Sequence, residues 1–200
     1  MGIRYTQKTR EVLGFICDYG FISTKVCSKV FYKDNKNGYT QARVILNKLF
    51  KNGDLKRYEH ESTKEWIYQI NKKVVDPHRK AMIDLYSEIF MLVDSIEYFK
   101  VEATWCISNR RSDAHIIYKK NGRVNSLLVE YERYHSTSQK KLDEIYASEE
   151  VQEFYKLKYK VEDYFPNVLV ISPLATTKLV SDKISIVCIA YNFEGLGEII

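Results

Sequence analysis

Apolar residues recur at three- and four-residue intervals in the front part of the chain, which is the spacing of helices that bury one face. This spacing predicts three short helices, over about residues 7–19, 24–31 and 39–51. Thr6 and Ser23 can cap the first two helices, because their hydroxyls can accept a free backbone N–H. Gly20 and Gly53 suit the left-handed position at which a helix ends.

Two short strands are predicted after these helices, at 55–58 and 65–70, with a turn over 60–63 between them. Three short helices followed by a two-stranded ribbon, all within about 70 residues, are typical of a winged helix-turn-helix domain. The apolar stripe of the third helix is formed by Ala42, Ile45, Leu46, Leu49 and Phe50. Because this stripe must face a core, the opposite side of the helix is expected to face solvent.

Strands and helices alternate in the rear part of the chain, which predicts a mixed sheet flanked by helices and an α+β or α/β fold overall. Asp76 and Pro77 can start a helix and mark the junction, so we expect a winged-helix domain over 1–74 and a second domain over 75–200. Strands are predicted at 101–105, 114–119, 126–131, 167–172 and 185–190. Helices are predicted at 78–96, 138–147, 149–158 and 176–181. The strand at 126–131 is the most apolar and is expected to be central.

Charge is unevenly divided between these two parts. Residues 1–74 hold 15 Lys and Arg against 7 Asp and Glu, a net charge of +8. Residues 75–200 hold 16 Lys and Arg against 19 Asp and Glu, a net charge of −3. A basic module joined to a mildly acidic one suggests that the first meets a polyanion, although a well-charged soluble surface would give the same count.

Composition excludes several other classes of protein. The chain is 45% hydrophobic and 28% charged, which is enough to bury a core and unlike a disordered protein. No apolar stretch reaches the roughly 20 residues of a membrane span, and the first residues lack a signal-peptide core, so a cytoplasmic location is expected. The four Cys and four His are scattered, which favours reduced thiols over a zinc site. There is no phosphate-binding Gly-rich loop and no His cluster of the kind that a relaxase uses.

The polar side of the third predicted helix carries side chains suited to double-stranded DNA. One α-helix fits the major groove, where short or forked polar groups can bond to base edges. The candidates for base contacts are Thr40, Gln41, Arg43 and Asn47. The candidates for phosphate contacts are Tyr39, Lys48 and Lys51 on the helix, and Lys56, Arg57, His60 and Lys64 on the wing. The basic charge favours DNA over the alternative, a winged helix that docks a protein.

Three carboxylates stand near the ends of two predicted neighbouring strands in the rear part. Asp113 begins one strand, and Glu130 and Glu132 end the next. Because side chains alternate along a strand, Glu130 and Glu132 are expected to point the same way, with Asp113 able to join them. Three such oxygen ligands could hold Mg²⁺ and activate water against a phosphodiester.

Four segments in this region resemble the replication-relaxation family. They are RSDA at 111–114, LLVEYERY at 127–134, KLDEIY at 141–146 and FPNVLVI at 165–171. The family comes from plasmids and integrative elements, and joins a winged-helix half to a half related to the PD-(D/E)XK nuclease fold. The resemblance covers nearly the whole chain in the right order, and it implies the same two halves here.

The chain departs from the nuclease pattern at one position. Catalytic members place a Lys two residues after the acidic strand residue, and Glu132 occupies that position. Lys140 or Lys141, in the following helix, could supply the missing cation. Otherwise the acids are relics that cap strands, pair with Arg111 or Arg133, or face a partner. We favour the relic, and so expect no catalytic residue, metal or other cofactor.

The resemblance implies a sequence-specific double-stranded DNA-binding accessory protein of a plasmid or conjugative element. Such a protein would act at an origin of transfer or replication beside a relaxase or a replication initiator. Two-fold symmetric DNA sites would suit a homodimer. The alternatives are a Mg²⁺-dependent DNA endonuclease that uses Asp113, Glu130 and Glu132 with Lys140 or Lys141, and a transcriptional regulator of the mobile element.

Overall fold

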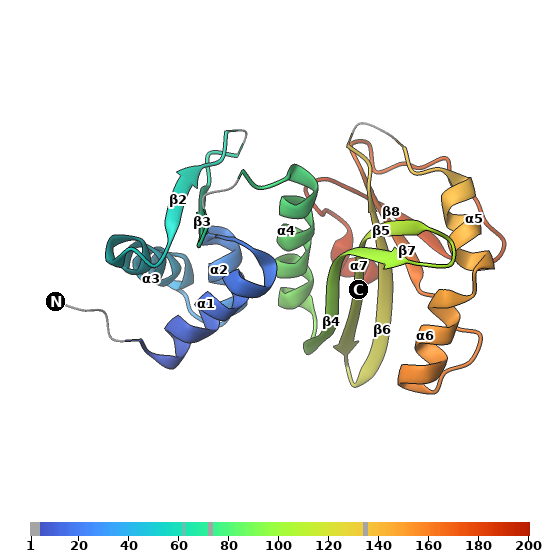
Figure 1. Cartoon of the computed structure of the whole chain (residues 1–200), viewed down its shortest axis with the longest axis horizontal. Helices are drawn as coiled ribbons and strands as arrows, with labels where there is room; N and C mark the ends of the chain where they lie inside the picture. The colour runs from blue at the N-terminus through green and yellow to red at the C-terminus, as the bar shows by residue number, and fades with distance from the viewer. Residues whose placement is uncertain (1–4, 62, 72–73, 134–135) are drawn as a thin grey trace. The chain divides into compact units, whose positions relative to one another are not determined.

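The structure, a computed structural model, is mixed α+β and describes residues 5–61, 63–71, 74–133 and 136–200 (Figure 1). It divides into two compact units, Met1–Met91 and Leu92–Ile200. The elements of the first unit are α1 (Gln7–Tyr19), β1 (Ile22–Ser23), α2 (Thr24–Phe31), α3 (Gly38–Asn52), β2 (Lys56–Glu59), β3 (Trp66–Gln69) and most of α4 (Pro77–Leu92). Within the described residues, no helix combines the length and the apolar character needed to cross a membrane.

The three predicted front helices and their caps are confirmed. Thr6 Oγ1 accepts the N–H of Thr9 at 3.3 Å, and Ser23 Oγ accepts the N–H of Val26 at 3.1 Å. Gly20 ends α1 with a φ of +90°, and Gly53 ends α3 with a φ of +88°. Both φ values lie in the region that favours glycine, so these local signals fix where the helices begin and end.

The predicted ribbon is part of a three-stranded antiparallel sheet with the order β1-β3-β2. Ile22 of β1 pairs with Tyr68 of β3, and Arg57 of β2 pairs with Tyr68 on its other side. The strand β1 is only two residues long, too short for an alternating pattern to reveal it. Its pairing fixes the ribbon to the end of α1.

Helix α4 ends earlier than predicted. The helix was expected to continue to residue 96, but it ends at Leu92, and Ser95 begins a strand by pairing with Lys119. Ser95 and Ile96 satisfy their backbone groups in a ladder, which outweighs the helical spacing of the apolar residues before them.

Helix α4 also groups with the first unit, so the compact units divide between Met91 and Leu92 and not at 74/75. Lys80 of α4 forms an ion pair with Glu65 beside β3 at 2.9 Å. Glu88 forms ion pairs with Lys25 and Lys29 of α2, and the ring of Tyr86 lies 5.6 Å from that of Phe15. These contacts are long-range, so the local composition around Pro77 does not reveal them.

The second unit has one five-stranded mixed sheet with the order β4-β5-β6-β7-β8. The strands are β4 (Ser95–Trp105), β5 (Arg110–Lys120), β6 (Arg123–Tyr131), β7 (Asn167–Ser172) and β8 (Ile186–Ala190), and the helices are α5 (Gln139–Ala147), α6 (Glu150–Tyr159) and α7 (Leu196–Ile199). Strands β4, β5 and β6 are antiparallel, whereas β6, β7 and β8 are parallel. The predicted central position of the 126–131 strand is confirmed.

Helices α5 and α6 connect β6 to β7 and cover one face of this sheet (Figure 1). Leu142 and Ile145 of α5 and Val151 of α6 are fully buried in one cluster with Leu128 and Val168 of the sheet. A connection that contains helices is what a parallel pair of strands requires. The packing fixes the orientation of α5 over the end of β6.

The helix predicted at 176–181 is absent from the structure. Ser172 Oγ accepts the N–H of Thr176, Thr177 Oγ1 accepts that of Leu179, and Ser181 Oγ accepts that of Ile184. Side-chain hydroxyls therefore take N–H groups that a helix would use, which is how Ser and Thr compete with helical structure.

Replacing Lys80 with Ala should destabilise the first unit strongly. The Lys80 side chain is 7% exposed and holds the carboxylates of Glu65 and Asp84, the latter at 2.7 Å. Its loss leaves both carboxylates without their cation, which should lower the free energy of unfolding by about 3 kcal/mol in urea titrations.

The matched control is Lys8→Ala, which breaks the exposed Lys8–Glu11 pair of α1. This change should cost far less stability, because exposed ion pairs are screened by water. Equal losses in the two variants would contradict a structural role for Lys80.

Candidate functional site

The polar side of α3 is exposed, as its amphipathic pattern predicts. Ala42, Leu46 and Leu49 are fully buried. The exposed side chains of the helix are Tyr39, Thr40, Gln41, Arg43, Val44, Lys48, Lys51 and Asn52. The residues expected to contact DNA from this helix therefore share one solvent-facing surface, apart from Asn47, which is half-buried.

This surface carries positive charge that the neighbouring side chains do not neutralise. Lys8, Lys25 and Lys29 of α1 and α2 each pair with a glutamate. In the described ranges, by contrast, no carboxylate lies within ion-pair distance of the cations of α3 and the ribbon, which are Arg43, Lys48, Lys51, Lys56, Arg57 and Lys64. An anion approaching α3 thus meets cations that need not first leave an intramolecular carboxylate.

Asn47 and Arg57 have structural partners inside the unit. Arg57 Nη1 donates to Asn47 Oδ1 at 2.7 Å, and Tyr68 Oη donates to the same oxygen at 3.2 Å. The Arg57 guanidinium also lies over the rings of Phe50 and Trp66, with centroid distances of 4.3 and 4.6 Å. Arg57 thus braces the ribbon against α3, and Asn47 keeps only its NH₂ group for any base contact.

The remaining wing candidates lie at or near the turn of the ribbon. Lys56 and Lys64 are exposed. His60 Nδ1 lies 3.1 Å from Thr63 Oγ1, which closes the turn. Burial is the main cause that lowers the pKa of His60, and the ammonium of Lys80 adds to it. The neutral form of His60 is therefore favoured, which makes Lys56 and Lys64 the stronger candidates for phosphate contacts.

A second polar site lies at the end of β6 in the other unit. Glu130 is 2% exposed, and its Oε2 accepts a hydrogen bond from Lys141 Nζ at 2.5 Å. Trp105 Nε1 donates to Ser112 Oγ of β5 at 3.2 Å, and the Ser112 hydroxyl acts to lower the pKa of the Glu130 carboxyl. Glu130 Oε1 is buried and has no hydrogen-bond partner among the described residues.

Burial of Glu130 favours its neutral form. Loss of solvent raises the pKa of the Glu130 carboxyl to about 7, and the Asp113 carboxylate adds to this effect while Lys141 opposes it. A carboxyl that titrates near neutral pH, with a cation in contact, can exchange protons or accept a further positive ligand at physiological pH.

The other two predicted acids accept hydrogen bonds from backbone N–H groups. Asp113 Oδ2 accepts the N–H of Tyr131 at 2.6 Å, and Glu132 Oε1 accepts the N–H of Thr137 at 2.8 Å. Within the ranges that the structure covers, no three His, Cys, Asp or Glu side chains are grouped so that they could hold a metal ion. The expectation that Asp113, Glu130 and Glu132 form one three-carboxylate group is therefore wrong for these side-chain positions.

The two candidate lysines differ in their partners. Ser138 caps α5 by accepting the N–H of Lys141, and the burial of Leu142 sets the phase of the helix, so that Lys141 reaches Glu130. Lys140 is 78% exposed and lies 3.9 Å from Glu144.

One of the two predicted arginine partners, Arg111, is engaged with a different acid. Arg111 pairs with Glu102 at 3.2 Å and not with the three acids. Ser112 and Trp105, which contact the site, were not predicted, because an isolated Ser and Trp carry no sequence signal.

The free energy of unfolding should fall as the pH rises from about 4.5 to 7, because the unfolded chain releases the Glu130 proton before the folded chain does. Above about pH 7 this contribution should stay constant. Glu130→Gln should remove this part of the pH dependence in urea titrations across that range.

Glu144→Gln serves as the control, since the hydrogen bond from Arg110 lowers the pKa of Glu144 and its titration lies below this window. This variant should keep the wild-type slope between about pH 4.5 and 7. An unchanged slope in Glu130→Gln would show that another group causes it.

The chain was compared with protein-family models, curated proteins and solved structures. None of these comparisons finds a match.

Proposed function

We propose that the first unit is a winged helix-turn-helix that binds double-stranded DNA through α3 and the β2–β3 ribbon. The observation that carries this proposal is the exposed α3 surface, whose cations lack a carboxylate partner among the described residues. A ribbon braced beside that helix by Arg57 supports the same proposal. The exposed large apolar side chains of α3 are Tyr39 and Val44, among cations of the kind that the centre of a protein–protein interface usually lacks.

In this proposal, α3 enters the major groove with Thr40, Gln41 and Arg43 at base edges. Arg43 is exposed and can offer its forked donors to guanine O6 and N7. Lys48, Lys51 and the ribbon lysines bind phosphates, which orient the helix without reading sequence. Asn47 contributes through its NH₂ group alone.

The biological setting that we propose follows from the resemblance to the replication-relaxation family. The protein acts in the cytoplasm as an accessory factor of a plasmid or conjugative element, at an origin of transfer or replication, beside a relaxase or initiator. The second unit presents a surface to that partner or to a second copy of the chain. A homodimer would place two copies of α3 on adjacent major-groove faces of a palindromic site.

Arg43→Ala should cost about 1–3 kcal/mol on a duplex selected from a random pool by the wild-type protein, and much less on a scrambled duplex. Lys48→Ala should weaken binding to both duplexes alike and reduce the salt dependence by about one released ion. Fluorescence anisotropy at several salt concentrations measures both effects.

Arg10→Ala is the matched control, because Arg10 is an exposed arginine of α1, on another helix of the same unit. It should leave both affinities nearly unchanged. If Arg10→Ala weakens binding as much as Arg43→Ala does, binding is diffuse and does not run through α3.

A second candidate function, a Mg²⁺-dependent DNA endonuclease, is favoured by one specific observation. Lys141 Nζ contacts the buried Glu130 carboxylate beside Asp113, and so supplies the cation that Glu132 does not. The sheet that carries this site has three antiparallel strands, followed by two helices and a parallel strand. In this role Lys141 would stabilise negative charge that develops on the scissile phosphate.

One feature of the site fits a magnesium ion, namely a carboxylate oxygen that is available to bind it. Glu130 Oε1 is a buried carboxylate oxygen that lacks a partner among the described residues, and Mg²⁺ needs only one or two carboxylates beside water and phosphate oxygens. Glu130 and Asp113 would hold the ion. When bound, it would lower the pKa of a water that attacks the phosphodiester.

Under this second proposal, the wild-type protein nicks supercoiled plasmid in Mg²⁺ or Mn²⁺, and Glu130→Gln and Lys141→Met each lower the rate by about a hundredfold or more. Lys140→Met is the control, because Lys140 is the neighbouring lysine and points to Glu144. It should nick at the wild-type rate. Absence of nicking by the wild-type protein in large excess would eliminate this candidate and leave DNA binding untouched.

A further inference from the structure

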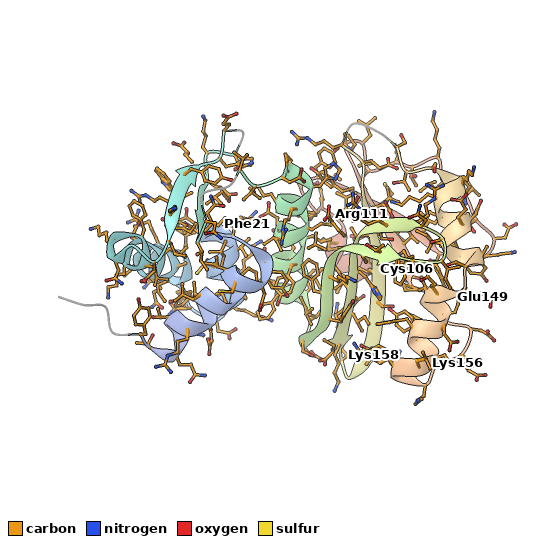
Figure 2. The ribbon with its side chains drawn as sticks, in the orientation of Figure 1. Phe21, Cys106, Arg111, Glu149, Lys156 and Lys158 are labelled. Carbon is orange, nitrogen blue, oxygen red and sulfur yellow. The ribbon has the colours of Figure 1, made fainter. Side chains whose placement is uncertain are left out.

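The first unit contains a pocket that neither proposed function uses. Its volume is about 450 Å³, within the 300–1,000 Å³ of small-molecule sites. Its wall comes from the end of α1, the end of β3 and the start of α4. The apolar part of this wall includes Ile16, Phe21, Ile70 and Val75, and Phe21 is labelled in Figure 2 just after α1.

One polar group in this wall is buried without a hydrogen-bond partner. Gln69 lines the pocket and is 2% exposed, and its Nε2 finds no acceptor among the described residues. An amide N–H that is buried without an acceptor destabilises the fold. A ligand oxygen in the pocket would remove that penalty by accepting the N–H.

A cation stands at the same pocket. Arg79 lines it, with Nη2 lying 3.7 Å from the position that a Cβ would take on Gly20. In the described part of the chain, no carboxylate lies within ion-pair distance of Arg79. Asp76 also lines the pocket, but its Oδ1 accepts the N–H groups of His78 and Arg79 at 2.8 and 3.2 Å and so caps α4.

We propose that this pocket binds a small organic carboxylate. The carboxylate oxygens accept hydrogen bonds from Gln69 Nε2 and from the Arg79 guanidinium, which is a charge-assisted pairing. The apolar body of the ligand packs against Ile16, Phe21 and Val75. The site is independent of α3 and the ribbon turn, so it stands whether or not the protein binds DNA.

Benzoate is the probe, since it combines a carboxylate with an apolar ring, and benzyl alcohol is the neutral control. In ¹⁵N-resolved NMR of the full chain without DNA, benzoate should shift the Gln69 side-chain NH₂ signals, and benzyl alcohol should bind at least about tenfold more weakly. Arg79→Gln should weaken benzoate binding by about tenfold, whereas Arg10→Gln, an exposed arginine elsewhere on α1, should not.

Gln69→Leu tests whether the Gln69 amide serves to bind a ligand or has a structural hydrogen-bond partner in the protein. It should abolish benzoate binding and raise the melting temperature, because it removes a buried unpaired N–H from the free protein. A lower melting temperature would show that Gln69 has a structural partner and would overturn the proposal. Equal binding of benzoate and benzyl alcohol, or no shift of the Gln69 signals at millimolar benzoate, would overturn it as well.

Discussion

The chemistry of the second unit depends on the burial of β6 between two strands of opposite direction. Its residues Leu127, Leu128 and Val129 are almost fully buried, because β5 and β7 cover its edges and α5 covers one of its faces. Glu130 is the next residue of this strand and is buried with it. The ammonium of Lys141 opposes the effect of this burial by favouring the charged carboxylate.

Burial also determines which side chains face solvent in the first unit, where α3 has one buried face. Burial of Ala42, Leu46 and Leu49 determines which side chains of α3 remain in water, and these are mostly polar or cationic. No separate signal is needed to present Arg43 and Lys48 on one surface, since the core-facing stripe already sets the rotation of the helix. The α3 surface and the Glu130–Lys141 site are thus both positioned by the burial of apolar residues next to them in the chain.

Features set by residues close together in the sequence could be predicted, whereas features set by distant residues could not. Thr6, Ser23, Gly20 and Gly53 act within one helical turn, so the helix ends could be predicted from neighbouring residues. The end of α4 and the Arg57 brace depend on partners far along the chain, and no local pattern contains them.

The acidic site shows the same limit at the level of single side chains. Strand alternation predicted that Glu130 and Glu132 would act together, but the backbone N–H of Thr137 engages Glu132 instead. Lys141 was one of two candidates from the sequence, and only the packing of Leu142 distinguishes it from Lys140.

The position of Arg57 between two aromatic rings has a mechanical consequence. Its guanidinium joins Asn47 of α3 to β2 and lies over Phe50 and Trp66, so these contacts connect the helix and the ribbon in the free protein. Elements that are already connected in the free protein lose less conformational entropy when a ligand binds. In the DNA-binding role proposed above, a helix and ribbon held at a fixed spacing would favour DNA whose groove width already matches that spacing.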